Sequence, residues 1–154
     1  MNEHDVYLGN PNLKKANTQI EFTEEQIIEF LKCKEDPVYF ANNYMKIVSL
    51  DEGLVQFKPY DFQEKLINNF HENRFNICKM PRQTGKSTTS VSYLLHYCVF
   101  NDSVNIGILA NKAATARDLL GRLQTAYENL PKWMQQGIIS WNKGSLELEN
   151  GSKI

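Results

Sequence analysis

The chain is organised around residues 75–89, where an apolar run meets a turn that closes with Gly85-Lys86-Ser87. The apolar run, 75–79, has the character of a strand, and a helical pattern follows the turn at once. That pattern places apolar side chains at Val91, Leu94, Leu95, Tyr97 and Cys98. The order strand, loop, helix therefore constrains the fold more than any other feature of the sequence.

A loop of this kind binds phosphate for physical reasons. Consecutive backbone N–H groups surround the phosphate oxygens, and the helix N-terminus adds partial positive charge. Lys86 fits the residue that bridges the outer phosphates, and the Ser87 hydroxyl fits the one that holds the metal. Met80 stands where the full pattern has its first glycine, so the match is a variant. Gly-Lys-Ser can also be an ordinary helix start, but its context favours nucleotide binding.

Composition limits the classes that remain. The 154 residues suffice for one ordinary domain, and 42% hydrophobic with 23% charged residues excludes wholesale disorder. The formal net charge of -1 gives no overall basic field for nucleic acid. The first 19 residues are polar without a signal-peptide core, and no apolar run reaches membrane-spanning length. We therefore expect a soluble, cytoplasmic protein without a membrane.

The cysteines indicate a reducing compartment. They are widely spaced and set beside large apolar residues, so we expect three buried free thiols: Cys33, Cys78 and Cys98. The histidines form no ligand spacing with them, so we expect no zinc site; they are His4, His71 and His96.

The residues before the loop predict a small helical and hairpin subdomain over 21–58, preceded by a flexible arm over 1–20. Thr23 and Gln26 have capping-box spacing, which predicts a helix over 24–34. Asp36-Pro37 is a second helix start. The runs 46–50 and 54–57 flank Asp51-Glu52-Gly53 and predict a hairpin.

Residues 59–154 predict the first half of a P-loop ATPase domain of the α/β class. A second apolar strand is expected over 104–110 and a helix over 113–130. Alternation of strands and helices with short connections is typical of a parallel sheet flanked by helices, here incomplete. Ligands in such folds bind at the carboxyl ends of strands, where this loop falls.

A helix expected over 60–70 carries Phe62, Leu66, Ile67 and Phe70 on one face, which is the pattern of a core helix. Gln63 lies off that face, 22 residues before Gly85. Its amide offers a donor and an acceptor to an adenine edge, and the ring of Phe62 or Tyr60 can stack on a base. Both readings stay open on spacing alone.

The last residues predict a hairpin that lacks one arm. The segments 138–141 and 145–149 alternate like strands, and Asn150-Gly151 is a strong turn signal. Only 152–154 remain as a returning strand, so we expect a fragment with an unpaired sheet edge. No convincing carboxylate ends an apolar strand after the loop, although hydrolysis requires one. We therefore expect truncation before the acidic, magnesium-binding strand.

The loop 80–87 resembles the variant Walker A loop of the large terminase subunit of T4-like tailed bacteriophages. Other segments share the resemblance, which runs from about residue 20 to the last residue: 36–41, 62–63, 107–112 and 141–145. In that family the N-terminal half is an ATPase that drives DNA into the prohead, and a C-terminal nuclease cuts the concatemer.

The resemblance implies a role for each residue of the loop. Lys86 would contact the outer phosphates of ATP, and Ser87 would ligate Mg²⁺. Arg82 matches the arginine thought to neutralise developing charge on the transferred phosphoryl group, which makes Arg82 and Lys86 the expected catalytic residues. A solvated loop charge is the alternative for Arg82. The expected nucleotide-binding set is Phe62, Gln63, Arg82, Gln83, Thr84, Gly85, Lys86, Ser87 and Thr88.

By resemblance, the partners would be double-stranded DNA, the portal protein and the small terminase subunit, with a ring of full-length subunits acting at the prohead in the host cytoplasm. The candidate DNA contacts are spread among acids and indicate solvated helix faces instead: Lys14, Lys15, Lys112, Arg117, Arg122 and Lys132. Two alternatives remain: a fragment of a helicase-like nucleic-acid translocase, and a nucleotide-binding fragment that does not hydrolyse. We expect the parent protein to be an ATPase with an endonuclease, and the fragment to be inactive alone.

Overall fold

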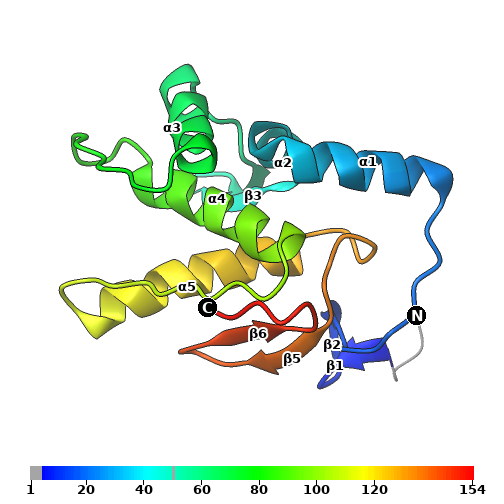
Figure 1. The fold of residues 1–154 in the computed structure, drawn as a ribbon. Coiled ribbons are helices and arrows are strands. Elements are labelled where there is room, and N and C mark those ends of the chain that lie inside the picture. Colours follow the sequence, from blue (N-terminus) through cyan, green and yellow to red (C-terminus); the bar gives the residue numbers. More distant parts are fainter. Residues whose placement is uncertain (1–4, 50) are drawn as a thin grey trace.

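The computed structural model describes residues 5–49 and 51–154, which form a mixed α/β fold (Figure 1). These residues contain five helices and three two-stranded antiparallel sheets. None of the helices in these ranges is both long and apolar enough to cross a membrane. His4 and Leu50 lie outside the described residues.

The first two helices begin where their capping residues predict. Thr23 Oγ1 accepts from Gln26 N at 3.2 Å and Gln26 Oε1 accepts from Thr23 N at 3.1 Å, which starts α1 (Glu24–Glu35). Asp36 Oδ1 accepts from the backbone N–H groups of Val38 and Tyr39, which starts α2 (Pro37–Tyr44). Local hydrogen bonds thus fix both boundaries, and both predictions are confirmed.

The predicted hairpin and the helix after it are also present. β3 (Lys46–Ser49) pairs antiparallel with β4 (Gly53–Gln56), and Gly53 takes φ +73° at the end of the turn. The next helix, α3 (Asp61–Glu72), buries Leu66 and Ile67. Of these elements, α3 lies against α4 and β3 lies against α5 (Figure 1).

Two long helices make the centre of the core. α4 (Lys86–Phe100) lies against α5 (Ala113–Glu128), and their buried side chains join one apolar cluster. Cys98 of α4 and Cys33 of α1 are buried in it, and burial raises the pKa of each thiol to about 12. Cys78 is exposed, so the prediction of three buried thiols is wrong for this residue.

The strands at the end of the chain are better paired than the sequence suggested. β5 (Ile138–Trp141) pairs antiparallel with β6 (Leu146–Leu148), and the predicted turn at Asn150-Gly151 reverses the chain. Residues 152–154 then bond to β6 on one side, while Lys153 bonds to the backbone of 104–106 on the other. The expected unpaired edge is therefore occupied by a segment from before α5.

The described part of the N-terminal arm is docked, whereas a loose arm was expected. β1 (Val6–Tyr7) pairs with β2 (Asn10–Lys14), and Lys15 forms a parallel bridge to Ile138 of β5. Leu13 is buried, and Lys14 Nζ forms an ion pair with Glu149 at 3.0 Å. No strand or helix periodicity marks this arm in the sequence, because the contacts that hold it come from residues more than a hundred positions away.

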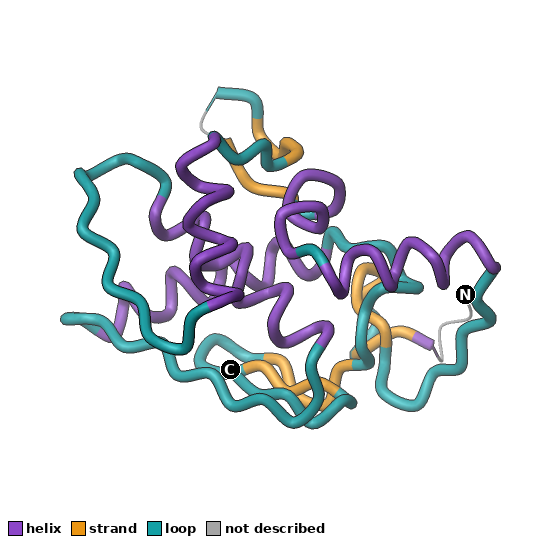
Figure 2. The backbone as a smooth tube through the Cα atoms, turned by 45° about the horizontal axis from the view of Figure 1, so that its top comes forward, coloured by secondary structure: helices purple, strands orange, loops and turns teal. Residues whose placement is uncertain are grey.

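Two predicted strands are wrong. Residues 73–85 form no strand, and Figure 2 draws the connection between α3 and α4 as one long loop. In 104–110 only Asn105 takes part in a bridge, to Lys153. Ile77 is 100% exposed and Leu109 is 92% exposed, so no neighbouring strand or helix covers them. A strand needs a partner for its N–H and C=O groups, and the described residues form no parallel sheet flanked by helices.

Candidate phosphate-binding site

The loop before α4 turns through two residues in the left-handed region. Gln83 has φ +62° and Gly85 has φ +73°, and Gly85 is also the N-cap of α4. Gly85 has no side chain with which to cap this helix end, so it leaves the N–H groups of the first turn available to a ligand. Thr84 Oγ1 donates to Pro81 O at 3.0 Å and tightens the turn. The geometry is that of an anion-binding helix start.

Lys86 closes the loop on itself. It is the first residue of α4, and its ammonium donates to Met80 O at 2.8 Å and to Pro81 O at 2.6 Å. The side chain therefore reaches back across the loop, where it places a positive charge beside the helix N-terminus. The bond to Met80 uses its backbone carbonyl, which any residue can supply. This contact therefore does not require the glycine that the full motif has at position 80.

The other predicted loop residues lie around this charge. Arg82, Gln83 and Ser87 are exposed, and Thr84, Gly85 and Thr88 are half-buried. The Ser87 hydroxyl, in the first turn of α4, is accessible to a metal ion bound at a phosphate and is chemically suited to it. Among residues 5–49 and 51–154, no three His, Cys, Asp or Glu side chains gather as a metal site.

Gln63 lies under the loop. It is 4% exposed; its Nε2 donates to Thr84 O at 3.2 Å and its Oε1 accepts from Tyr60 N at 2.9 Å. A Cβ at Gly85 would meet this amide, so the Gln63 side chain would have to shift, and the φ of +73° itself favours glycine at this position. Gln63 was predicted to lie beside the loop, and it does. Each end of its amide forms a hydrogen bond with the protein backbone.

The two rings proposed to stack on a base stack on each other. Tyr60 and Phe62 have ring centroids 5.8 Å apart with an interplanar angle of 12°. Tyr60 is 70% exposed and Phe62 is 44% exposed, so both rings keep a solvent-facing surface near the start of α3. Their part in nucleotide binding stays a prediction.

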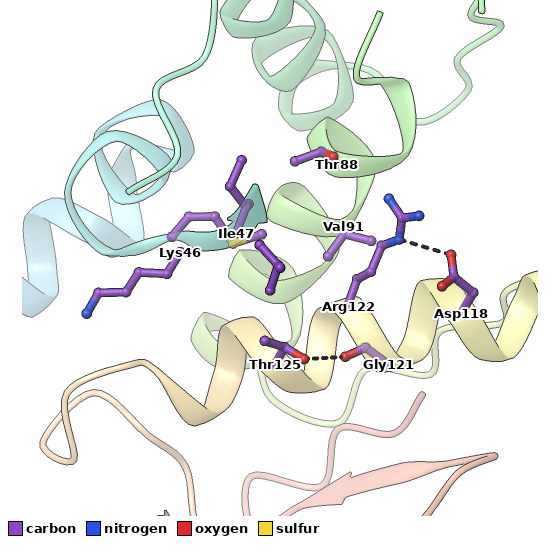
Figure 3. A pocket seen from close by; sticks show the side chains of 10 residues that line it. Lys46, Ile47, Thr88, Val91, Asp118, Gly121, Arg122 and Thr125 are labelled. Atoms are coloured by element: carbon purple, nitrogen blue, oxygen red, sulfur yellow. Dashed lines mark hydrogen bonds and ion pairs between the residues drawn. The ribbon is translucent and has the colours of Figure 1, made fainter. Parts of the chain in front are cut away.

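Beside the first turn of α4 lies a cavity of about 630 Å³, which the sequence analysis did not find. Its walls come from β3, α4 and α5, and Figure 3 shows Thr88 and Val91 facing Ile47 across it. On α5, Arg122 Nε donates to Asp118 Oδ2 at 2.9 Å at the edge of the cavity. The four-residue spacing of that pair was visible in the sequence, but the space beside it arises from packing between three elements.

A family model matches the part of the chain that contains the loop and the elements after it. The family model described as "Terminase large subunit, T4likevirus-type, N-terminal" matches residues 77–154, just over half of the chain. The match begins within the loop and includes α4, α5, β5 and β6. The chain therefore belongs to the family of the N-terminal part of T4likevirus-type large terminase subunits.

Proposed function

We propose that this chain is the ATP-binding part of a terminase large subunit, the motor that packages phage DNA into proheads. The observation that carries the proposal is Lys86, whose ammonium lies against the loop carbonyls at an uncapped helix N-terminus. Backbone N–H groups from Gln83 to Thr88 would hold the phosphates. On this proposal the fold is of the P-loop NTPase type.

The chemistry of each side chain follows from its place. Lys86 would exchange its two carbonyl partners, on half-buried Met80 and exposed Pro81, for phosphate oxygens in strong charge-assisted bonds. The Ser87 hydroxyl would ligate Mg²⁺, and the exposed Arg82 would neutralise charge developing on the phosphoryl group. Mg²⁺ would supply charge neutralisation at the outer phosphates when bound.

The family match favours this function over a helicase-like translocase. As parts of the same proposal, the partners are double-stranded DNA, the portal protein and the small terminase subunit, and the site of action is the host cytoplasm. We propose ATP binding with Mg²⁺ as the activity of this chain.

Lys86→Ala tests the proposal, with Lys79→Ala as the control from the exposed part of the same loop. Binding of ATP with Mg²⁺ is measured by isothermal titration calorimetry. Lys86→Ala should weaken ATP binding by about tenfold or more, because a charge-assisted contact worth about 1.5–3 kcal/mol is lost. Lys79→Ala should bind ATP like the unmodified protein. Equal ATP affinity in both variants would refute the proposed role of the loop.

A further inference from the structure

We infer that the outer face of α1 is an interaction surface, and that the partner it fits is α1 of a second copy of this chain, packed antiparallel. The inference is independent of the proposed function, because it uses no residue of the loop before α4. It rests on an exposed apolar stripe, on its spacing along the helix, and on the order of the charges at its two ends.

The inner side of α1 is already occupied by the core. Cys33 is buried there, and the ring of Phe30 lies edge-on to the ring of Phe100 of α4, with centroids 4.9 Å apart. These contacts hold α1 to the rest of the molecule. They leave the opposite side of the helix for solvent or for a partner.

The outer side of α1 is nevertheless apolar. Ile27 is 49% exposed, Ile28 is 55% exposed and Leu31 is 52% exposed. Their three- and four-residue spacing places these side chains on one helix face. Figure 1 shows α1 at the edge of the molecule, where this face can meet another protein. A contiguous exposed apolar stripe of this kind is typical of a protein contact.

The stripe continues into a charge at each end. Glu24, Ile27, Leu31 and Lys34 follow one another at intervals of three, four and three residues, which is the spacing of the contact positions of paired helices. All four residues, which we call the seam, are exposed. Within residues 5–49 and 51–154, the side chains of Glu24 and Lys34 have no hydrogen bond or ion pair, so both charges are free to meet a partner.

The order of these charges identifies the partner. In an antiparallel pair of α1 helices, residue 27 of one copy lies against residue 31 of the other, and residue 24 lies against residue 34. Glu24 then meets Lys34 twice, once at each end of the apolar layers. A parallel pair would instead bring Glu24 to Glu24 and Lys34 to Lys34, and these like charges would repel. The seam is therefore complementary to itself, as a two-fold contact requires.

The small size of the surface sets the strength of the pairing. Three half-exposed aliphatic side chains from each copy bury less area than the ~1,200 Å² at which stable interfaces begin. The expected dimer is therefore weak and reversible, with a dissociation constant of about 100 µM.

Sedimentation equilibrium of the unmodified chain between about 10 and 500 µM measures this association. A reductant is present because Cys78 is exposed and could form a disulfide between copies. The weight-average mass should rise with concentration toward twice that of one chain. A protein that stays monomeric over the whole range would overturn the inference, and the face would then belong to a different protein or to another segment of a longer subunit.

Charge reversal tests the register. Glu24→Lys should weaken the dimer by about tenfold, because both Glu24–Lys34 pairs become repulsive. The matched control is Glu25→Lys, which makes the same charge change in the first turn of α1 but outside the seam. It should change the dissociation constant by less than about twofold. The double variant Glu24→Lys/Lys34→Glu restores both pairs in reversed order and should recover the dimer. Equal losses in Glu24→Lys and Glu25→Lys, or no recovery in the double variant, would overturn the antiparallel pairing.

Leu31→Asp tests the apolar stripe. Because Leu31 is 52% exposed, the chain should fold with its helix content unchanged by far-ultraviolet circular dichroism, while self-association should disappear over the same concentration range. A dimer that persists in Leu31→Asp would overturn the assignment of this face as the contact.

Discussion

The sheet at the end of the chain and the loop before α4 differ in where their polar groups find partners. Residues 152–154 bond to β6 on one side, and Lys153 bonds to 104–106 on the other. Asn150 Nδ2 donates to the carbonyls of Cys98 and Asn101 at the end of α4. In the loop, Lys86 bonds to carbonyls only five and six residues away, and Gln63 supplies the one described side-chain contact from another helix.

This difference separates stability from binding. The bonds of Asn150 to the carbonyls of Cys98 and Asn101 are part-buried and long-range, so breaking one leaves a part-buried polar group without its partner. The bonds of the loop are exposed or half-buried, and in the proposed function a phosphate replaces the carbonyls that hold Lys86. We therefore expect substitutions in the sheet region to lower stability without changing phosphate binding, and substitutions in the loop to do the reverse.

The largest loss of stability is expected from Gln135→Leu. Gln135 is 2% exposed; its Oε1 accepts from Lys14 N at 3.0 Å and its Nε2 donates to the carbonyls of Asn12 and Leu130 at 3.0 Å each. Leucine would leave these groups buried without partners and release the N-terminal hairpin. We expect the free energy of unfolding in urea to fall by about 4 kcal/mol.

The matched control for this prediction is Gln124→Leu. Gln124 Nε2 donates to Asn142 O at 2.9 Å, but this hydrogen bond is exposed and water can replace it. Its loss should cost less than about 1 kcal/mol. Equal costs for the two variants, or a change in ATP affinity in Gln135→Leu, would contradict the separation between the two regions.

A somewhat smaller loss is expected on acidification, because α4 buries a histidine in its second half. His96 is 1% exposed, with Nε2 at 2.8 Å from Cys33 O, and burial lowers its pKa to about 4 from an ordinary 6.5. Above pH 6.5 the ring is neutral in both the folded and the unfolded chain. Between pH 6.5 and 4 the unfolded chain binds a proton that the folded chain does not, so stability falls by about 3 kcal/mol.

Urea unfolding at pH 7 and pH 4 measures this loss, and His96→Phe isolates it. Phenylalanine fits a site already lined by the rings of Phe40 and Phe100. The pKa of Glu149 is lowered, although burial alone would raise it, because the N–H groups of Asn17 and Gly137 and the Lys14 ammonium bond to its carboxylate. Protonation of such carboxylates at low pH destabilises both the unmodified protein and His96→Phe. The unmodified protein should therefore lose more unfolding free energy between pH 7 and pH 4 than His96→Phe does. Equal losses in the two proteins would mean that His96 is not the group that titrates.

The sequence predicted the features that depend on nearby residues. The capping bonds of Thr23 and Asp36 and the turn at Asn150-Gly151 lie within three residues of their partners, and all three predictions are confirmed. α4 also begins where Gly85 and Lys86 predicted a helix start. Such signals are readable because the residues that form the bond are adjacent in the sequence.

Features that depend on distant partners were missed or wrong. Gln135 is an ordinary polar residue in the sequence, yet it holds an arm more than a hundred residues away. The cavity beside Thr88 is lined by residues of β3, α4 and α5 that lie far apart in the sequence. The apolar composition of 75–79 and 104–110 predicted strands that the structure does not have. An apolar run becomes a strand only where another segment supplies hydrogen-bond partners.

The smallest effect is expected for a substitution that tests this last point directly. Ile77 and Ile138 both lie in runs that the sequence predicted to be strands, but Ile77 is 100% exposed and Ile138 is 1% exposed. Ile77→Thr should change the free energy of unfolding by less than about 0.5 kcal/mol, because no contact is lost. Ile138→Thr should cost about 3 kcal/mol, since it removes buried apolar volume and buries a hydroxyl. Urea unfolding of both variants decides the point: a large cost at Ile77 would mean that the loop is packed in solution, and the contrast between the loop and the sheet would then fail.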